Sequence, residues 1–216
     1  MDVVVRRLRT EDIGQVVEIE QEAFSPIWTG TPFKRELNNR FASYLVACCD
    51  PKGGLPDEAG GGDEAAHSPF RARFLNLAQS LFRREQPADA AGTLVAGYVS
   101  VWYQGEEAHI TEIAVRETMR GRGIGELLLI GSLRAAVEYG ARVMTLEARV
   151  SNFIAQRLYE KYGFKLVGTR KGYYSDNRED AVIMTTSPID TAEYQHTFQQ
   201  LQEAYRSRRG EICIQS

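Results

Sequence analysis

A run of alternating glycines limits what this chain can fold into more than any other feature. The run reads Arg120-Gly121-Arg122-Gly123-Ile124-Gly125 and stands between an apolar stretch typical of a strand and one typical of a helix. Glycines at alternate positions let the backbone turn sharply and approach a ligand closely. The start of the following helix presents N–H groups that have no partner within the helix, and two arginines add positive charge and forked donors. The run therefore predicts a binding loop for a pyrophosphate.

The spacing of the glycines excludes two common kinds of phosphate loop. No Lys-Ser or Lys-Thr pair follows Gly125, which excludes the loop of nucleotide triphosphatases. In a dinucleotide-binding loop the last glycine comes three positions after the second, whereas Glu126 stands at that place here. The pattern that remains is R-x-x-G-x-G at the start of a helix. A turn with only a structural role is the alternative interpretation.

Apolar periodicity along the chain predicts an α/β fold. Strands are expected at residues 3–8, 44–49, 93–102, 108–115, 141–147, 164–169 and 181–185. Helices are expected at residues 12–24, 32–37 and 152–162, and from the glycine loop to Gly140, which is suited to the position beyond a helix end. The order strand, glycine loop, helix, strand and helix predicts a mixed sheet with a parallel pair of strands at its centre.

Two segments stand outside this pattern. Residues 51–63 are rich in Gly, Pro, Asp and Glu and predict a loop, and residues 70–81 then place apolar side chains at helical spacing among arginines. A helix that covers the core, a membrane-surface helix and a protein-docking face are all open for 70–81. From Pro188 onward, aromatic residues predict a helix that packs on the domain or on a twin subunit. We therefore expect one domain over 1–187, with an insertion at 51–92, and a helical extension over 188–216.

Composition narrows the range of partners. The formal net charge of the 216 residues is −3 and the basic residues are dispersed, which argues against a nucleic-acid partner. No stretch approaches the roughly 20 apolar residues that span a bilayer, and the first residues do not have the pattern of a signal peptide. We expect a cytoplasmic protein without a membrane partner. The three cysteines, which include the neighbours Cys48 and Cys49, have no metal-ligand spacing, so we expect no metal and three buried apolar side chains.

Motifs after the glycine loop resemble those of a known family. They are Leu146-Glu147-Ala148-Arg149-Val150-Ser151-Asn152, Leu158-Tyr159-Glu160, Tyr162-Gly163-Phe164 and Gly172-Tyr173-Tyr174. With the R-x-x-G-x-G loop they resemble the RimI-type branch of the GNAT superfamily of N-acetyltransferases, whose members acetylate protein N-terminal amines, typically the alanine of a small-subunit ribosomal protein. The resemblance implies the GNAT fold, a mixed central sheet with a splayed parallel strand pair flanked by helices. It also implies acetyl-CoA as co-substrate and direct transfer in a ternary complex.

The resemblance also implies roles for single residues. Glu147 corresponds to the catalytic base and Tyr159 to the acid that protonates the departing thiolate. Asn152 corresponds to an asparagine that hydrogen-bonds the CoA arm, although it also suits the cap of the next helix. The backbone of Ile113, Ala114 and Val115 is implied to pair with the pantetheine arm. The pyrophosphate is implied to bind to the glycine loop, which consists of Arg120, Gly121, Arg122, Gly123, Ile124 and Gly125. Tyr173, Tyr174 and Trp28 are implied to enclose the amino end of the substrate.

The acceptor amine is the least constrained part of this interpretation. An α-amine has a pKa near 8 against about 10.4 for lysine, so a far larger fraction of it is neutral at pH 7. This makes a protein N-terminus the easier target for a weak base. Acetylation of a lysine or of a small amine on the same fold is the alternative, and a non-catalytic acyl-CoA-binding module is another. Monomer and homodimer are both open.

Overall fold

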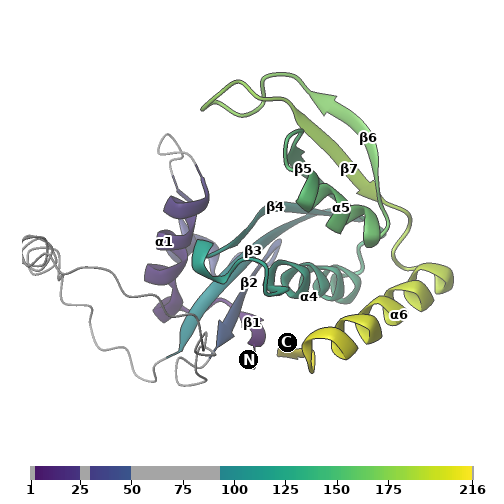
Figure 1. Ribbon diagram of the computed structural model, residues 1–216, viewed down its shortest axis with the longest axis horizontal. Helices are drawn as coiled ribbons and strands as arrows, with labels where there is room; N and C mark the ends of the chain where they lie inside the picture. The colour runs from purple at the N-terminus through teal and green to yellow at the C-terminus, as the bar shows by residue number, and fades with distance from the viewer. Residues whose placement is uncertain (1–2, 25–29, 50–92, 216) are drawn as a thin grey trace, which may run out of the picture.

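Eight strands form one mixed sheet across the part of the chain described by the computed structural model, residues 3–24, 30–49 and 93–215 (Figure 1). In chain order they are β1 (Val3–Arg7), β2 (Ala42–Cys49), β3 (Leu94–Gln104), β4 (Glu107–Val115), β5 (Val143–Arg149), β6 (Phe164–Arg170), β7 (Ala181–Thr186) and β8 (Cys213–Gln215). Their order across the sheet is β6-β7-β5-β4-β3-β2-β1-β8. The predicted mixed sheet is thus confirmed.

Helices lie on both faces of this sheet. They are α1 (Ile13–Ala23), α2 (Phe33–Glu36), α4 (Ile124–Tyr139), α5 (Phe153–Lys161) and α6 (Ala192–Arg209), with single 3-10 turns at Thr10–Asp12 and Glu117–Met119. Strand β2 shows why two faces are needed, because all eight of its residues are buried. Alternate side chains of a strand point to opposite faces. Leu45 and Ala47 accordingly pack in the core beneath α4, and Tyr44 and Val46 in the core beneath α1 and α2.

The parallel pair β4–β5 separates part-way along its length. Paired residues run only from Glu107 to Ile110 on β4 and from Val143 to Leu146 on β5. Beyond that point β4 continues beside β3 up to Val115, and β5 continues beside β7, with which it pairs along its other edge up to Arg149. The central splayed pair expected from the sequence is therefore present. It leaves one backbone edge of the last residues of β4 without a strand partner among the described residues.

A bulge in β4 decides which side chains face this gap. The register between β3 and β4 shifts after Ser100, so that Thr111 is the extra residue. A bulge of this kind bends the strand and reverses the alternation of its side chains. Ile110 packs in the core beneath α4, whereas Ala114 packs in the core beneath α1. Glu112 is thereby turned inward on the α1 face, where it is buried.

Helix α4 packs closely because it carries a glycine where it crosses the sheet. A Cβ added at Gly131 would lie 3.1 Å from Cγ1 of Val5 and 3.4 Å from Cδ1 of Leu45. The helix ends at Gly140, whose φ of 90° is readily adopted only by glycine. The predicted span and end of this helix are confirmed.

The C-terminal helix packs on the body of the protein. Tyr194 donates a hydrogen bond of 2.8 Å from its hydroxyl to the carbonyl oxygen of Tyr162, and Arg134 on α4 donates one of 2.8 Å from Nε to Gln202. Phe198 and Tyr205, on the same face of α6, are both only 4% exposed. Packing on the domain, one of the two alternatives expected for this helix, is therefore observed.

Three expectations about the fold are wrong in detail. The sequence predicts no strand after α6, yet β8 pairs in parallel with β1, because three residues are too few to show a periodicity. Cys48 and Cys49 are buried, but Cys213 on this edge strand is exposed. The strand expected at 141–147 is Val143–Arg149, so Glu147 lies within β5 and not at its end.

The remaining expectations about the fold lie outside the described residues. The loop at 51–63, the helix at 70–81 and Trp28 all belong to this group. In the part of the chain that the structure describes, no helix combines the length and apolar character needed to cross a bilayer.

Candidate active site

Glu147 is held from two sides beside the gap between β4 and β5. Its Oε2 lies 3.0 Å from Nε2 of His109 on β4, and its Oε1 lies 3.0 Å from a guanidinium nitrogen of Arg170 on β6. The Glu147 side chain is only 8% exposed, whereas that of His109 is 31% exposed. The site therefore presents a largely buried carboxylate whose partner imidazole reaches the surface.

The two predicted catalytic side chains approach the gap from opposite faces of the sheet. Leu146 and Ala148 pack in the core beneath α4, in the same cluster as Tyr159 of α5. Glu147 lies between them in β5, so it points to the other face. A gap between the strands is what makes both faces accessible to one bound molecule.

Tyr159 presents a hydroxyl that stays protonated. Burial raises the pKa of this phenol well above its ordinary value, and the nearby Tyr174 raises it further. No hydrogen bond joins the Tyr159 hydroxyl to any other residue among those that the structure describes. A neutral O–H of this kind can donate to a ligand. Asn152 positions the start of α5, because its Oδ1 accepts a hydrogen bond of 3.2 Å from the backbone N–H of Ala155.

An arginine that sequence analysis did not single out holds the loop of the predicted substrate-binding tyrosines. Arg149, at the end of β5, lies 2.9 Å from Asp176 and 3.1 Å from Glu179. Its guanidinium carbon also lies 3.9 Å from the ring centre of Tyr174, at cation–π distance. Tyr173 packs edge-on against Tyr174 and is 48% exposed. The loop therefore places one aromatic ring partly buried and one at the surface.

The glycine loop has the geometry of an anion site. Gly121 and Gly123 have φ angles of 75° and 84°, which favour glycine, and Gly123 begins α4 with no side chain capping the helix. A Cβ built at Gly121 would meet nothing within 4 Å. Unpaired N–H groups at the start of a long helix, with open space beside Gly121, suit the oxygens of a phosphate. The donors of this loop thus fit the pyrophosphate of CoA.

The backbone that precedes the loop has one unpaired edge among the described residues. Ile113 and Ala114 pair with β3 on one side only, since the pairing with β5 ends at Ile110. The carbonyl oxygen of Val115 accepts a hydrogen bond of 3.3 Å from Nε of Arg120, which ties the strand end to the loop. A ligand arm that runs along this edge would find the backbone groups of Ile113 and Ala114.

Two buried acids lie on the α1 face near the site and were not found from the sequence. Glu112 accepts hydrogen bonds from Thr31 Oγ1 at 2.8 Å and from the hydroxyls of Tyr98 and Ser100. Glu20 on α1 accepts a hydrogen bond of 3.2 Å from the backbone N–H of Thr31. Burial raises the pKa of Glu112. Together the two carboxylates fasten the start of the segment that leads to α2.

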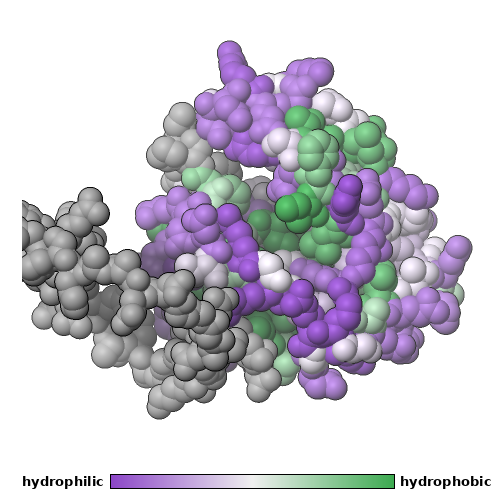
Figure 2. Space-filling view, in the orientation of Figure 1, coloured by the Kyte–Doolittle hydropathy of each residue, from purple (hydrophilic) through white to green (hydrophobic). Residues whose placement is uncertain are grey.

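The surface around the site is partly apolar. Figure 2 shows hydrophobic side chains over α5 and the adjoining β6 and β7, and a recess between α1 and α5. The exposed apolar residues of this region are Phe153, Ile154, Leu166 and Val167.

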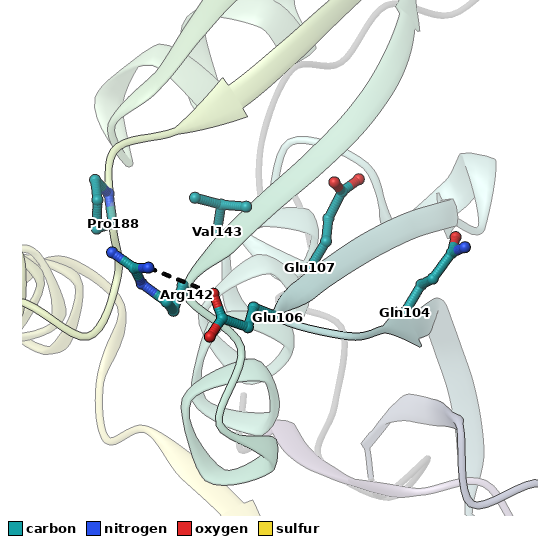
Figure 3. Close-up of a pocket in the computed structure, with 6 residues that line it drawn as sticks. All are labelled: Gln104, Glu106, Glu107, Arg142, Val143 and Pro188. Carbon is teal, nitrogen blue, oxygen red and sulfur yellow. Dashed lines mark hydrogen bonds and ion pairs between the residues drawn. The ribbon is translucent and has the colours of Figure 1, made fainter.

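A cavity lies elsewhere, at the opposite end of the parallel pair. Its volume is about 380 Å³, and it is lined by Gln104, Glu106, Glu107, Arg142, Val143 and Pro188. In Figure 3 the side chains of Arg142 and Glu106 lie next to one another, and the distance between Nη1 of Arg142 and Oε2 of Glu106 is 3.4 Å. Because these residues stand where β4 and β5 begin, the cavity is separate from the gap where the strands part.

Known proteins share both the sequence and the fold of this chain. The model of the acetyltransferase (GNAT) family matches residues 62–164. A Sulfurisphaera tokodaii protein named N-alpha-acetyltransferase is 46% identical over 183 residues, covering 83% of this chain and 90% of that protein. A Bacillus subtilis protein provisionally named a ribosomal protein bS18-alanine N-acetyltransferase is 35% identical over 181 residues, covering 83% of this chain and 92% of its own length. The chain belongs to the GNAT acetyltransferase family.

A solved structure shows the fold of this GNAT acetyltransferase independently. The crystal structure of the ribosomal-protein-S18-alanine N-acetyltransferase from Escherichia coli superposes with a TM-score of 0.61 at 23% identity, covering 88% of this chain and 96% of that one. The predicted family, fold class and enzyme class are therefore confirmed. His109, Arg149 and Arg170 are the additions that the geometry makes to this site.

Proposed function

We propose that this GNAT acetyltransferase transfers an acetyl group from acetyl-CoA to the N-terminal α-amine of a protein, with a ribosomal protein as the natural acceptor. The observation that carries the proposal is the paired His109 and Glu147 beside the gap between β4 and β5. The relatives support the acceptor class, because their names specify N-alpha-acetyltransferases and ribosomal-protein-alanine N-acetyltransferases. With such an acceptor, we propose that the reaction takes place in the cytoplasm. For the enzyme itself, both a monomer and a homodimer stay open.

The coenzyme would be held by backbone groups more than by side chains. The loop from Arg120 to Gly125 and the start of α4 would bind the pyrophosphate. The free edge at Ile113, Ala114 and Val115 would pair with the pantetheine arm, as a peptide pairs with a sheet edge, and Asn152 would add a side-chain hydrogen bond. When bound, acetyl-CoA supplies an acetyl thioester, whose carbonyl carbon is open to attack by an amine.

Glu147 and His109 would remove the proton of the acceptor amine. A neutral imidazole that donates its Nε2 proton to Glu147 keeps a lone pair on Nδ1. The partly exposed His109 can therefore meet the amine or a water molecule, and Glu147 stabilises the charged imidazole that results. An α-amine needs little help at neutral pH, because its pKa is near 8. A protein N-terminus is therefore an easier acceptor for this pair than a lysine.

Tyr159 would stabilise the departing thiolate. Since burial raises its pKa, the phenol keeps its proton and acts as a hydrogen-bond donor to sulfur. Tyr173 and Tyr174 would contact the first residues of the acceptor, and Trp28 is proposed for the same role. Arg149 would keep the two tyrosines in place through its ion pairs with the loop.

An acceptor comparison tests the proposal. Released thiol is measured with acetyl-CoA and three acceptors: a peptide that begins with Ala, the same peptide with a blocked N-terminus and an internal lysine, and a small polyamine. We expect turnover with the free Ala peptide to exceed turnover with the blocked peptide at least 100-fold. Turnover confined to the small amine, or equal on both peptides, would contradict the proposal.

A further inference from the structure

Helix α6 brings basic side chains to the glycine loop from the far end of the sequence. Arg209 donates a hydrogen bond of 3.3 Å from a guanidinium nitrogen to the carbonyl oxygen of Gly121. The hydroxyl of Tyr205 donates one of 3.4 Å to the carbonyl oxygen of Gly123. In the first turn of α4, Oε1 of Glu126 lies 3.2 Å from a guanidinium nitrogen of Arg208. The last turn of α6 therefore lies against the loop that would bind the pyrophosphate.

The loop and the helix fit together closely at one point. A Cβ added at Gly123 would lie 3.2 Å from Nε and 3.4 Å from Cδ of Arg209. Glycine at this position thus serves two purposes, because it permits the positive φ of 84° and leaves room for the guanidinium. The side chain of Arg209 is set beside the loop backbone while the residue as a whole stays exposed.

The contact between α6 and the glycine loop carries more positive than negative charge. Although burial opposes it, hydrogen bonds from Lys161 and Tyr162 lower the pKa of Glu126, and Arg208 adds to the effect. The single carboxylate of the first turn of α4 is therefore ionised and already paired. Arg209 pairs with no carboxylate among the residues that the structure describes. An arginine without a carboxylate partner, whose guanidinium contacts a loop that itself presents N–H groups at a helix start, is an arrangement that attracts an anion.

We propose that Arg209 is a coenzyme-binding residue, which supplies a forked, charged donor to the phosphate groups of CoA from the opposite side of the glycine loop. The inference rests on the coenzyme use set out under the proposed function. It gives the C-terminal helix a role in binding, since α6 then completes the phosphate site that the glycine loop begins. Tyr205 and Arg208 are positioning residues that hold the end of α6 to the loop and to α4.

The affinity for free CoA tests this inference without relying on turnover. Isothermal titration calorimetry would compare the full-length protein with Arg209→Gln and with the matched control Arg206→Gln. Arg206 lies in the same last turn, carries the same charge and is 3.9 Å from Glu211, away from the loop. We expect Arg209→Gln to weaken CoA binding about tenfold or more, as for the loss of a charge-assisted hydrogen bond, and Arg206→Gln to change it less than twofold.

A second ligand identifies the phosphate concerned. If the partner is the 3′-phosphate, the loss caused by Arg209→Gln disappears with 3′-dephospho-CoA, and if it is the diphosphate, the same loss remains; either result supports the proposal. Wild-type affinity of a folded Arg209→Gln protein for both ligands would overturn it. Should Arg209→Gln lower the melting temperature, Arg209→Lys, which keeps the charge but not the fork, replaces it and is expected to weaken binding at least threefold. Wild-type protein that binds no CoA would overturn the proposed function itself.

Discussion

A carboxylate held between an imidazole and a guanidinium is sensitive to a change of one atom. Replacing Glu147 with Gln keeps the shape of the side chain but removes the charge that stabilises a protonated His109. We expect kcat of Glu147→Gln to fall about 100-fold or more, as for the loss of general base catalysis. The dissociation constant of CoA, measured by calorimetry, should stay within twofold. An unchanged kcat would show that this pair does not take the proton.

Tyr159 offers a test that depends on pH. Because burial raises its pKa above the ordinary value of 10, the phenol stays protonated up to at least pH 10, and no loss of activity in that range can come from its ionisation. We expect Tyr159→Phe to lower kcat about tenfold or more and to leave the shape of the pH–rate profile unchanged between pH 6 and about 10. A falling alkaline limb that is present in the wild type and absent in Tyr159→Phe would contradict this role.

Glu112, buried on the α1 face, makes the stability of the protein depend on pH. Since burial raises its pKa, the folded protein binds this proton more tightly than the unfolded chain does. The contribution of Glu112 to stability is therefore largest below the ordinary carboxyl value, near 4.3, and is lost as the pH rises through the higher folded value. Glu112→Gln has no charge to bury. Its melting temperature relative to wild type should increase from pH 5 to pH 7, and a difference independent of pH would contradict this reasoning.

At the scale of single elements, the contact between α4 and the sheet decides what residue 131 can be. Ala would favour the helix by about 1 kcal/mol, but its Cβ would lie 3.1 Å from Val5, which is fully buried. Overpacking a rigid core costs about 1–3 kcal/mol. We expect Gly131→Ala to destabilise the protein by about 1 kcal/mol in urea unfolding. In a Val5→Ala background the same change should become neutral or stabilising, and equal costs in both backgrounds would refute the steric explanation.

The α4 and α5 segments also show which elements a sequence can predict. Both begin and end at residues with a local physical reason, such as the cap at Asn152 and the positive φ of Gly140. Their limits were predicted closely for that reason. Strand β8 has no such local signal, because it is short and its partner β1 is about 210 residues away in the sequence. Only tertiary contact makes it a strand.

The residues of the site also divide into those that the sequence identifies and those that only the fold brings together. Glu147 and Tyr159 could be named from the sequence because they stand within dense motifs. His109 could not, since a single histidine in a strand is ordinarily a packing residue, and only the register of β4 and β5 places it 3.0 Å from Glu147. Arg209 depends on the long-range packing of α6. Side chains brought together by such packing leave no pattern in the linear chain.

At the scale of the whole molecule, the C-terminal helix is part of the fold and not an appendage. Phe198 and Tyr205 are almost wholly buried in the core that includes α4 and α5. Burial of each such aromatic contributes about 1.5–3 kcal/mol. We expect a variant that ends at residue 187 to lose at least about 3 kcal/mol of its free energy of unfolding, with increased binding of a hydrophobic dye. A variant that ends at residue 212, which keeps the buried Ile212 and lacks β8, should lose much less. Similar stabilities of the two would show that α6 is dispensable.

The pairing of β1 with β8 has a consequence for how the protein is made. Residues 4–6 lie beside residues 213–215 at the same edge of the sheet, and Figure 1 shows the two marked chain ends close together. A ribosome delivers β1 first and β8 last, so this edge stays open throughout synthesis, with the backbone groups of β1 available to a wrong partner. The exposed charged side chain of Arg7 at its end would discourage such pairing until residue 215 has emerged.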